Sequence, residues 1–181
     1  DHLAIVARKD SRIINAKDLI NKKIGVTIGS NGEYFLDMVL NLNGLSRKDI
    51  QTIDVKPKQM GEKLLAKEVD AVATWNPEKF KAIKELGENA VTFNAENLYS
   101  PLFIVAATKD FAASNPEIIK KLLKALLSAT QFIKENPEQA HQIVAKEIGT
   151  DATVLNELAA SYHFNLSLEQ SFLTTLENET V

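Results

Sequence analysis

The chain has 181 residues, of which 45% are hydrophobic and 25% charged, as expected for a globular protein of one domain or two small lobes. Its formal net charge of −3 gives no support to a protein that binds the phosphate backbone of nucleic acids. The lack of cysteine removes disulfides, thiolate zinc sites and cysteine nucleophiles, and no apolar run approaches the roughly 18 residues that span a bilayer.

Strand and helix patterns alternate through the first half of the chain. The apolar run at 3–8 predicts a buried strand, and Asp18 and Leu19 fall in a short helical turn. Further strands are predicted at 23–28, 51–57, 70–75 and 90–94, with helices at 31–43, 58–69 and 76–87 between them. This alternation predicts an α/β fold with a mostly parallel sheet, helices on both faces and right-handed crossovers.

The second half of the chain changes character after Asn94. One more apolar strand is predicted in "SPLFIVAAT", residues 100–108, and the rest of the chain is predicted to be a helical segment. Its first helix carries an apolar stripe that includes Ile118, Leu122 and Leu126. Further helices are expected to begin at 137, 151 and 167.

The turn "GSNG" between the strand at 23–28 and the next helix is the first candidate site. It consists of Gly29, Ser30, Asn31 and Gly32. A helix N-terminus leaves backbone N–H groups unpaired and partly positive, and glycines let a ligand approach, so the turn could seat an anion. In the alternative interpretation, Ser30 and Glu33 form a capping box and glycine only makes the corner.

Known phosphate and nucleophile motifs do not match this turn. No lysine follows it, as a Walker A loop requires, and glycines at 25, 29 and 32 have the wrong spacing for a dinucleotide-binding fingerprint. A nucleophile elbow would need glycine where Ile28 stands. The turn therefore predicts an anion seat or a plain corner.

The stretch "ATWNPEKF", residues 73–80, is the second candidate site. Trp75 ends a predicted strand, where its indole could wall a pocket while Asn76 and Glu78 form hydrogen bonds. The alternative is that Trp75 belongs to the core. Both turns follow strands of one parallel sheet, so we expect them to open at the same edge. Tyr99, in "ENLYSP", could face the same cleft or lie in a solvated loop.

The titratable residues give no pattern for catalysis or metal binding. His2, His141 and His163 have no partners at zinc spacing, and the acidic residues are scattered over lysine-rich helices. No catalytic dyad or triad is recognisable. We therefore expect no enzyme activity, no cofactor and no metal.

Five stretches together resemble one protein family. "DHLAIVARKDSRI…AKDLINKKIGVTIGSNGEYFLDMVLNLNGLSRKDI" is similar to the second lobe of periplasmic solute-binding proteins of the nitrate/sulfonate/taurine class. "EVDAVATWNPE", "LGENAVTFN", "YSPLFIVAATKDFAASNPEIIKKLLKAL" and "IKENPEQAHQIVAKEIG" resemble the same class in the same order. The resemblance implies a type II periplasmic-binding-protein fold, in which two α/β lobes joined by hinge strands close on a small ligand.

The resemblance also implies roles for particular residues. Ser30, Asn31 and Gly32 match the segment that seats the ligand's anionic group, and Trp75 and Glu78 match a pocket segment. The stretches "LAIVARKDS" and "LFIVAATKD" match the hinge strands.

The start of the first lobe in such proteins has no counterpart in this sequence. We therefore expect residues 12–101 to form the complete second lobe, and 1–11 and 102–181 to supply hinge strands and helices of an incomplete first lobe. Apolar helix surface without its cover would favour a homo-oligomer or a helix swap between protomers.

The predicted function is the capture of a small anion or sulfonate by hinge closure, for delivery to the permease of an ABC-type importer. Because the chain begins with Asp1 and not Met, we expect an upstream segment to have been removed, and a periplasmic or extracellular location, membrane-associated in a Gram-positive cell. Alternatives are the sensory domain of a membrane receptor, the effector domain of a transcription regulator, and an enzyme resembling thiamin-pyrimidine synthases. The enzyme is disfavoured by the lack of cysteine.

Overall fold

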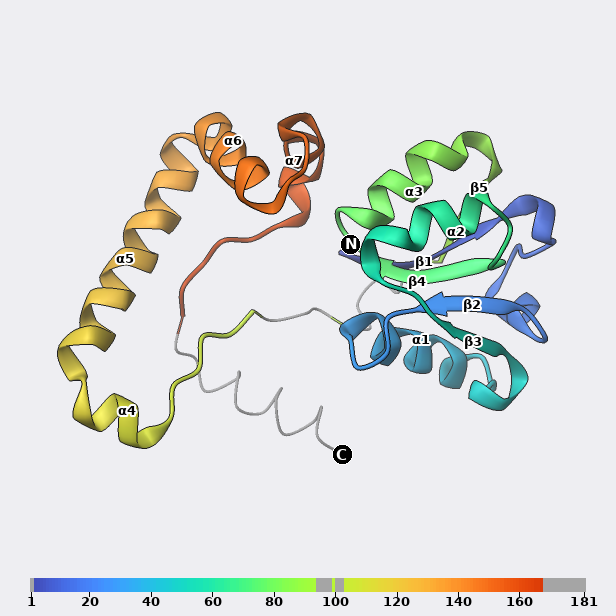
Figure 1. Cartoon of the computed structure of the whole chain (residues 1–181), viewed down its shortest axis with the longest axis horizontal. Helices are drawn as coiled ribbons and strands as arrows, with labels where there is room; N and C mark the ends of the chain where they lie inside the picture. Colours follow the sequence, from blue (N-terminus) through green and yellow to red (C-terminus); the bar gives the residue numbers. More distant parts are fainter. Residues whose placement is uncertain (1, 94–98, 100–102, 168–181) are drawn as a thin grey trace. The chain divides into compact units, whose positions relative to one another are not determined.

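The computed structural model describes residues 2–93, 99 and 103–167, and its chain forms two compact units (Figure 1). Unit 1 comprises Asp1–Phe103 and unit 2 comprises Ile104–Val181. Unit 1 contains a five-stranded sheet with helices. The described part of unit 2 is helical.

The sheet of unit 1 has the strand order β3-β2-β4-β1-β5. Its strands are β1 (Leu3–Arg8), β2 (Lys23–Val26), β3 (Gln51–Asp54), β4 (Ala71–Trp75) and β5 (Ala90–Phe93). β2 pairs in parallel with β3 and β4, whereas β1 runs antiparallel to β4 and β5, with Leu3 opposite Trp75. The predicted mostly parallel sheet is therefore confirmed, with β1 as its one antiparallel strand.

Helices cover both faces of this sheet, as predicted (Figure 1). They are α1 (Asn31–Leu42), α2 (Met60–Leu65) and α3 (Glu78–Leu86). α1 buries Phe35 and Leu36 against alternate residues of β1 such as Ile5. Val6, the neighbour of Ile5, points to the opposite face and packs with α2 and α3. Burying one large apolar side chain is worth about 1.5–3 kcal/mol, so this alternation fixes which face each helix covers.

Short 3-10 turns connect these elements. They are Lys9–Ser11, Ala16–Leu19, Arg47–Asp49, Pro57–Gln59 and Gly87–Asn89. The predicted helical turn at Asp18 and Leu19 is the second of these, capped by the side chain of Asn15. The turn Arg47–Asp49 reverses the chain after α1 and leads it into β3.

The described part of unit 2 contains four α-helices in succession. They are α4 (Lys109–Ser114), α5 (Pro116–Glu135), α6 (Pro137–Ile148) and α7 (Ala152–Leu158), followed by the 3-10 turn Ala159–Ser161. The predicted helix starts at Pro137 and Asp151 are confirmed, and the Asp151 carboxylate caps α7 by accepting the Thr153 N–H at 2.8 Å. α4 was not predicted. The helix expected after Ser167 lies outside the described residues.

The strand predicted at 100–108 is wrong over residues 103–108. These residues have no regular secondary structure, and Phe103 and Val105 are 79% and 68% exposed. A strand needs a neighbour for its backbone groups, and no described strand pairs with this segment. The assignment of 1–11 and 102–181 to hinge strands and an incomplete first lobe stays a prediction.

The apolar stripe of α5 is open to solvent within the described structure. Ile118, Leu122 and Leu127 are 52%, 40% and 54% exposed, and no residue of α5 is buried. The expected association through this surface stays a prediction. Across the described part of the chain, no helix combines the length and the apolar character that a membrane span requires.

The loop after β1 gives a prediction for acid stability. Hydrogen bonds from Lys67 and then from Arg8 lower the pKa of Asp10 from 3.8 to about 2. Because the ionised form is the one that folding favours, its contribution is complete above pH 3.8 and is lost as the pH falls through about 2. We expect Asp10→Asn to lower the melting temperature at pH 5 and the difference to shrink toward pH 2. A difference that stays constant over this range would contradict the assignment.

Candidate functional site

The turn between β2 and α1 lies at the carboxyl end of β2, where ligands bind in open α/β sheets. Gly29 has a positive φ of 73°, a conformation that glycine adopts without strain. Ser30 is the N-cap of α1. The helix therefore begins within two residues of a left-handed corner.

Glu33 holds this corner in place. Its Oε2 accepts the Gly29 N–H at 2.6 Å, and its Oε1 lies 3.2 Å from Nη2 of Arg47. The predicted capping box is thus only half correct, because the Ser30 hydroxyl accepts the Glu33 N–H at 3.4 Å while the Glu33 carboxylate bonds Gly29 in place of Ser30. Gly29, with its positive φ, lies next to the first turn of the helix, and its N–H bonds the Glu33 carboxylate in place of the Ser30 N–H.

The backbone amides of Ser30, Asn31 and Gly32 have no hydrogen-bond partner among the described residues. The Ser30 hydroxyl donates inward to the Thr27 carbonyl at 2.6 Å, so its proton is already in use. Asn31 is exposed and Gly32 is buried. The N-terminal end, or mouth, of α1 therefore offers free backbone N–H donors at Ser30 and Asn31, and the buried Gly32 follows them.

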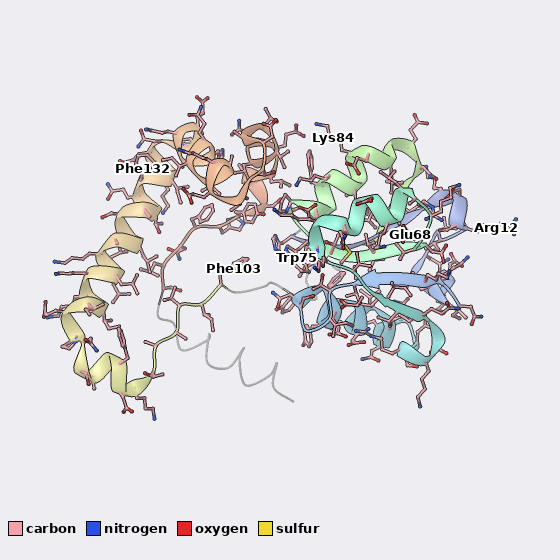
Figure 2. The ribbon with its side chains drawn as sticks, viewed as in Figure 1. Arg12, Glu68, Trp75, Lys84, Phe103 and Phe132 are labelled. Atoms are coloured by element: carbon pink, nitrogen blue, oxygen red, sulfur yellow. The ribbon has the colours of Figure 1, made fainter. Side chains whose placement is uncertain are left out.

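The Trp75 side chain packs against Gly32. A Cβ added at Gly32 would lie 2.9 Å from the Ala73 carbonyl oxygen and 3.2 Å from Cζ3 of Trp75. In Figure 2, Trp75 lies at one end of unit 1, and Arg12 and Glu68 lie toward the other. The expectation that both turns open at the same edge is met by direct contact between Gly32 and the indole, which is partly buried against the α1 side of the core.

The residues after Trp75 are more enclosed than the sequence indicates. Asn76 is 3% exposed; its N–H donates to the His2 carbonyl at 3.1 Å, and its side-chain amide has no hydrogen-bond partner among the described residues. The Glu78 side chain is 13% exposed, and its carboxylate pairs with Lys81 at 3.1 Å. A ligand would reach Asn76 only if this corner opened.

Two basic groups lie beside this corner, of which Lys79 is buried and His2 is partly buried. Burial lowers the pKa of Lys79, the second residue of α3. Burial, followed by the positive charges of Lys79 and of the N-terminus, lowers the pKa of His2. The His2 ring meets Phe103 edge to face at 5.9 Å between centroids. Burial therefore disfavours the charged forms of both basic side chains at this corner.

Tyr99 lies near the mouth of α1 through its contact with Tyr34. The two rings meet edge to face at 5.2 Å between centroids, and Tyr99 packs against the same core cluster as Trp75. Tyr99 is the described residue of the stretch "ENLYSP"; its neighbours at 96–98 and 100–101 lie outside the described part. The ring contact therefore places two aromatic side chains, Tyr34 and Tyr99, near the mouth of α1.

The structure brings Gly32, Trp75 and Tyr99 to one region but leaves Asn76 buried and Glu78 paired. Sequence reasoning missed Arg47, which lies 14 residues beyond Glu33 and reaches it by folding back along α1. Two residues 14 positions apart do not show the i, i+3 or i, i+4 spacing of a pair on one helix face, so the sequence gives no signal for this contact. No group of three or more His, Asp or Glu side chains in the described residues could hold a metal ion.

Comparisons with known proteins agree with this fold. A family model described as "NMT1/THI5 like" matches residues 2–140. A protein of Brucella abortus whose name describes it as a binding protein is 31% identical over 140 residues, which cover 74% of this chain and 43% of that protein. A protein of Haemophilus influenzae whose name assigns it to thiamine biosynthesis is 30% identical over 162 residues, covering 86% and 50%.

A solved structure resembles almost the whole chain. The periplasmic aliphatic sulphonate binding protein SsuA from Escherichia coli superposes with a TM-score of 0.83 over 99% of this chain and 62% of its own, at 21% identity. The similarity establishes a shared fold. The chain spans 43% of the length of the first relative and 62% of the structural one.

Proposed function

The chain belongs to the NMT1/THI5-like family, and from this premise we propose that it is the solute-binding component of an ABC-type importer. The solute is a small molecule that bears an anionic group, such as a sulfonate. The likeness in fold to a sulphonate-binding protein supports this ligand class.

The observation that carries the proposal is the contact between Gly32 and Trp75. It brings unpaired backbone N–H groups and an aromatic ring to one edge of the sheet. An anion would accept hydrogen bonds from Ser30 and Asn31 at the positive end of α1, and the apolar part of an organic anion would lie against the indole. Gly29 shapes the approach, and Tyr99 adds a second aromatic surface.

Capture by hinge closure is part of this proposal. Residues 12–101 would form one complete lobe, and 1–11 and 102–181 would supply hinge strands and first-lobe helices. The greater length of the relatives is compatible with that division. If the corner at Asn76 and Glu78 opened to a ligand, those side chains would add polar contacts, and closure of the lobes would be favoured by the contacts that only the closed form makes.

The partners and the location follow from the same proposal. The loaded protein would deliver its solute to a membrane permease, from the periplasm or from the outer face of a Gram-positive membrane. The structural relative is named a periplasmic protein, which supports this location. The open stripe of α5 favours association with a second copy or a helix swap.

A second candidate function is binding or chemistry in thiamine-precursor metabolism. The name of the Haemophilus influenzae relative favours it. Nothing in the described site offers a nucleophile with an adjacent base, so a binding role fits it better than an enzymatic one. A sensory domain and the effector domain of a transcription regulator, built on the same lobes, are the remaining alternatives.

A titration tests the proposed function. Trp75 is the only tryptophan, so its emission reports on the site alone. We expect ethanesulfonate and taurine to change this emission with saturation and to raise the melting temperature; ligand at a hundred times its Kd adds about 2.7 kcal/mol to stability. Nitrate tests the bare anion, and ethanolamine at equal ionic strength is the control without an anion.

The opposite result is a response to none of the three anions, or an equal response to ethanolamine. Either would contradict an anion seat at this edge. A response to an aminopyrimidine alone would favour the second candidate.

A further inference from the structure

Arg47 connects three elements around the mouth of α1. Its Nη2 lies 3.2 Å from Oε1 of Glu33 and donates to the Glu33 carbonyl oxygen at 3.3 Å and to Oδ2 of Asp37 at 3.1 Å. Its Nη1 donates to the Thr52 hydroxyl of β3 at 3.3 Å. The guanidinium therefore fixes the first turns of α1 to the strand beside β2.

Glu33 continues this connection to the candidate anion seat. One carboxylate oxygen faces Arg47, and the other accepts the Gly29 N–H at 2.6 Å. The Arg47 and Glu33 side chains are 29% and 26% exposed, so solvent screens the pair only in part. The Gly29 corner is thus held through Glu33 by a residue of the turn Arg47–Asp49.

The same arrangement raises an electrostatic problem for an anionic ligand. Glu33 is the third residue of α1, so its negative charge lies at the helix end that the ligand would approach. Like charges repel, and an unpaired carboxylate there would disfavour the ligand. Arg47 supplies an opposite charge at the far oxygen of Glu33, and it shares that charge with Asp37, to which both Nε and Nη2 of the guanidinium donate.

We propose that Arg47 is a positioning residue of the anion seat, which holds Glu33 on the Gly29 N–H and neutralises part of its charge. The inference rests on the proposed function and explains how a helix mouth that carries its own carboxylate can still accept an anion. Arg47 acts through Glu33 and need not touch the ligand.

Two variants and a double variant test this role. We expect Arg47→Leu to weaken ethanesulfonate binding about fivefold, because the Glu33 charge is left without its partner. Glu33→Gln keeps an acceptor for Gly29 without the charge and should bind at least as well as the unsubstituted chain. The double variant should regain part of the affinity lost in Arg47→Leu, because Glu33→Gln removes one of the two carboxylate charges that Arg47 faces, whereas a merely structural role of Arg47 would give no such rescue.

Lys63→Leu is the matched control. Lys63 is also 29% exposed and pairs with Glu68 at 2.6 Å, and Figure 2 shows Glu68 far from the Trp75 end of unit 1. The Lys63→Leu substitution removes a comparable ion pair and should leave ethanesulfonate binding unchanged. Loss of affinity in this control equal to that in Arg47→Leu would overturn the proposal.

A measurement without ligand separates this inference from the proposed function. Hydrogen exchange of the Gly29 amide should accelerate in Arg47→Leu and stay unchanged in Lys63→Leu. Only Arg47→Leu releases the Glu33 side chain, whose carboxylate accepts the Gly29 N–H. Unchanged exchange at Gly29 would overturn the positioning role, whether or not ethanesulfonate binds. If the unsubstituted chain binds no anion, the proposed function and the neutralising role fail, and exchange at Gly29 still decides the positioning role.

Discussion

Gly32→Ala should destabilise unit 1 and weaken anion binding together. The new Cβ would lie 2.9 Å from the Ala73 carbonyl oxygen, a backbone atom of a central strand that cannot move aside cheaply. It would also lie 3.2 Å from the Trp75 ring. Overpacking of this kind costs about 1–3 kcal/mol, offset in part by the better helix propensity of alanine.

Gly32→Ala should weaken binding as well as lower stability. To relieve the clash, α1 must move away from β4 and carry the Asn31 amide with it. We expect ethanesulfonate affinity to fall by about tenfold or more, since one lost charge-assisted hydrogen bond is worth roughly 1.5–3 kcal/mol. Binding is measured well below the melting temperature, so that only folded protein contributes.

Gly61→Ala is the matched control for this substitution. Its Cβ would meet only the carboxylate oxygen of Glu85 at 3.0 Å, the end of a flexible side chain. We expect it to leave the melting temperature unchanged or raised, and binding intact. If Gly32→Ala behaves like Gly61→Ala in both measurements, the close packing of Gly32, Ala73 and Trp75 is not what shapes the site.

Arg8→Met should cost stability without affecting binding. Arg8 is 5% exposed and connects β1 to the segment before β4, donating to the carbonyls of Leu64 and Val69 and facing Asp10 and Asp70. Removing one partner of a buried ionic network leaves its other groups unsatisfied. Because both carboxylates are partly exposed, we expect a loss of about 2–3 kcal/mol in the free energy of unfolding.

Chemical denaturation with Lys67→Met as the control checks this prediction. Lys67 also pairs with Asp10, but its side chain is 66% exposed, so its removal should cost less stability than the removal of buried Arg8. Arg8 is the last residue of β1, at the end opposite Leu3, which pairs with Trp75, so ethanesulfonate affinity should not change. Equal losses of stability in the two variants would show that the buried network is not a major support of unit 1.

The sheet and its helices could be predicted because their signals are local. A continuous apolar run marks β1, apolar alternation marks β2, and Ser30 and Gly44 bracket α1, so each element follows from its own residues. The run at 103–108 is equally apolar but forms no strand. A strand depends on a partner, and a partner cannot be inferred from the segment alone.

The candidate site could be predicted in position but not in detail. The rule that ligands bind at the carboxyl ends of parallel strands placed Gly32 and Trp75 at one edge, and the two are in contact. The bond from Gly29 to Glu33 depends on one positive φ, and the Arg47 pair depends on the chain reversal after α1. Neither is visible in residue spacing, and the ligand-binding role of these residues stays a prediction.

Mapping the backbone amides during an ethanesulfonate titration tests the central claim most directly. A free anion seat at the start of α1 predicts saturable shifts in the NMR resonances of the Ser30 and Asn31 amides and of the Trp75 indole N–H, with smaller shifts elsewhere. Saturable shifts confined to other parts of the chain, or none at these three groups, would contradict it.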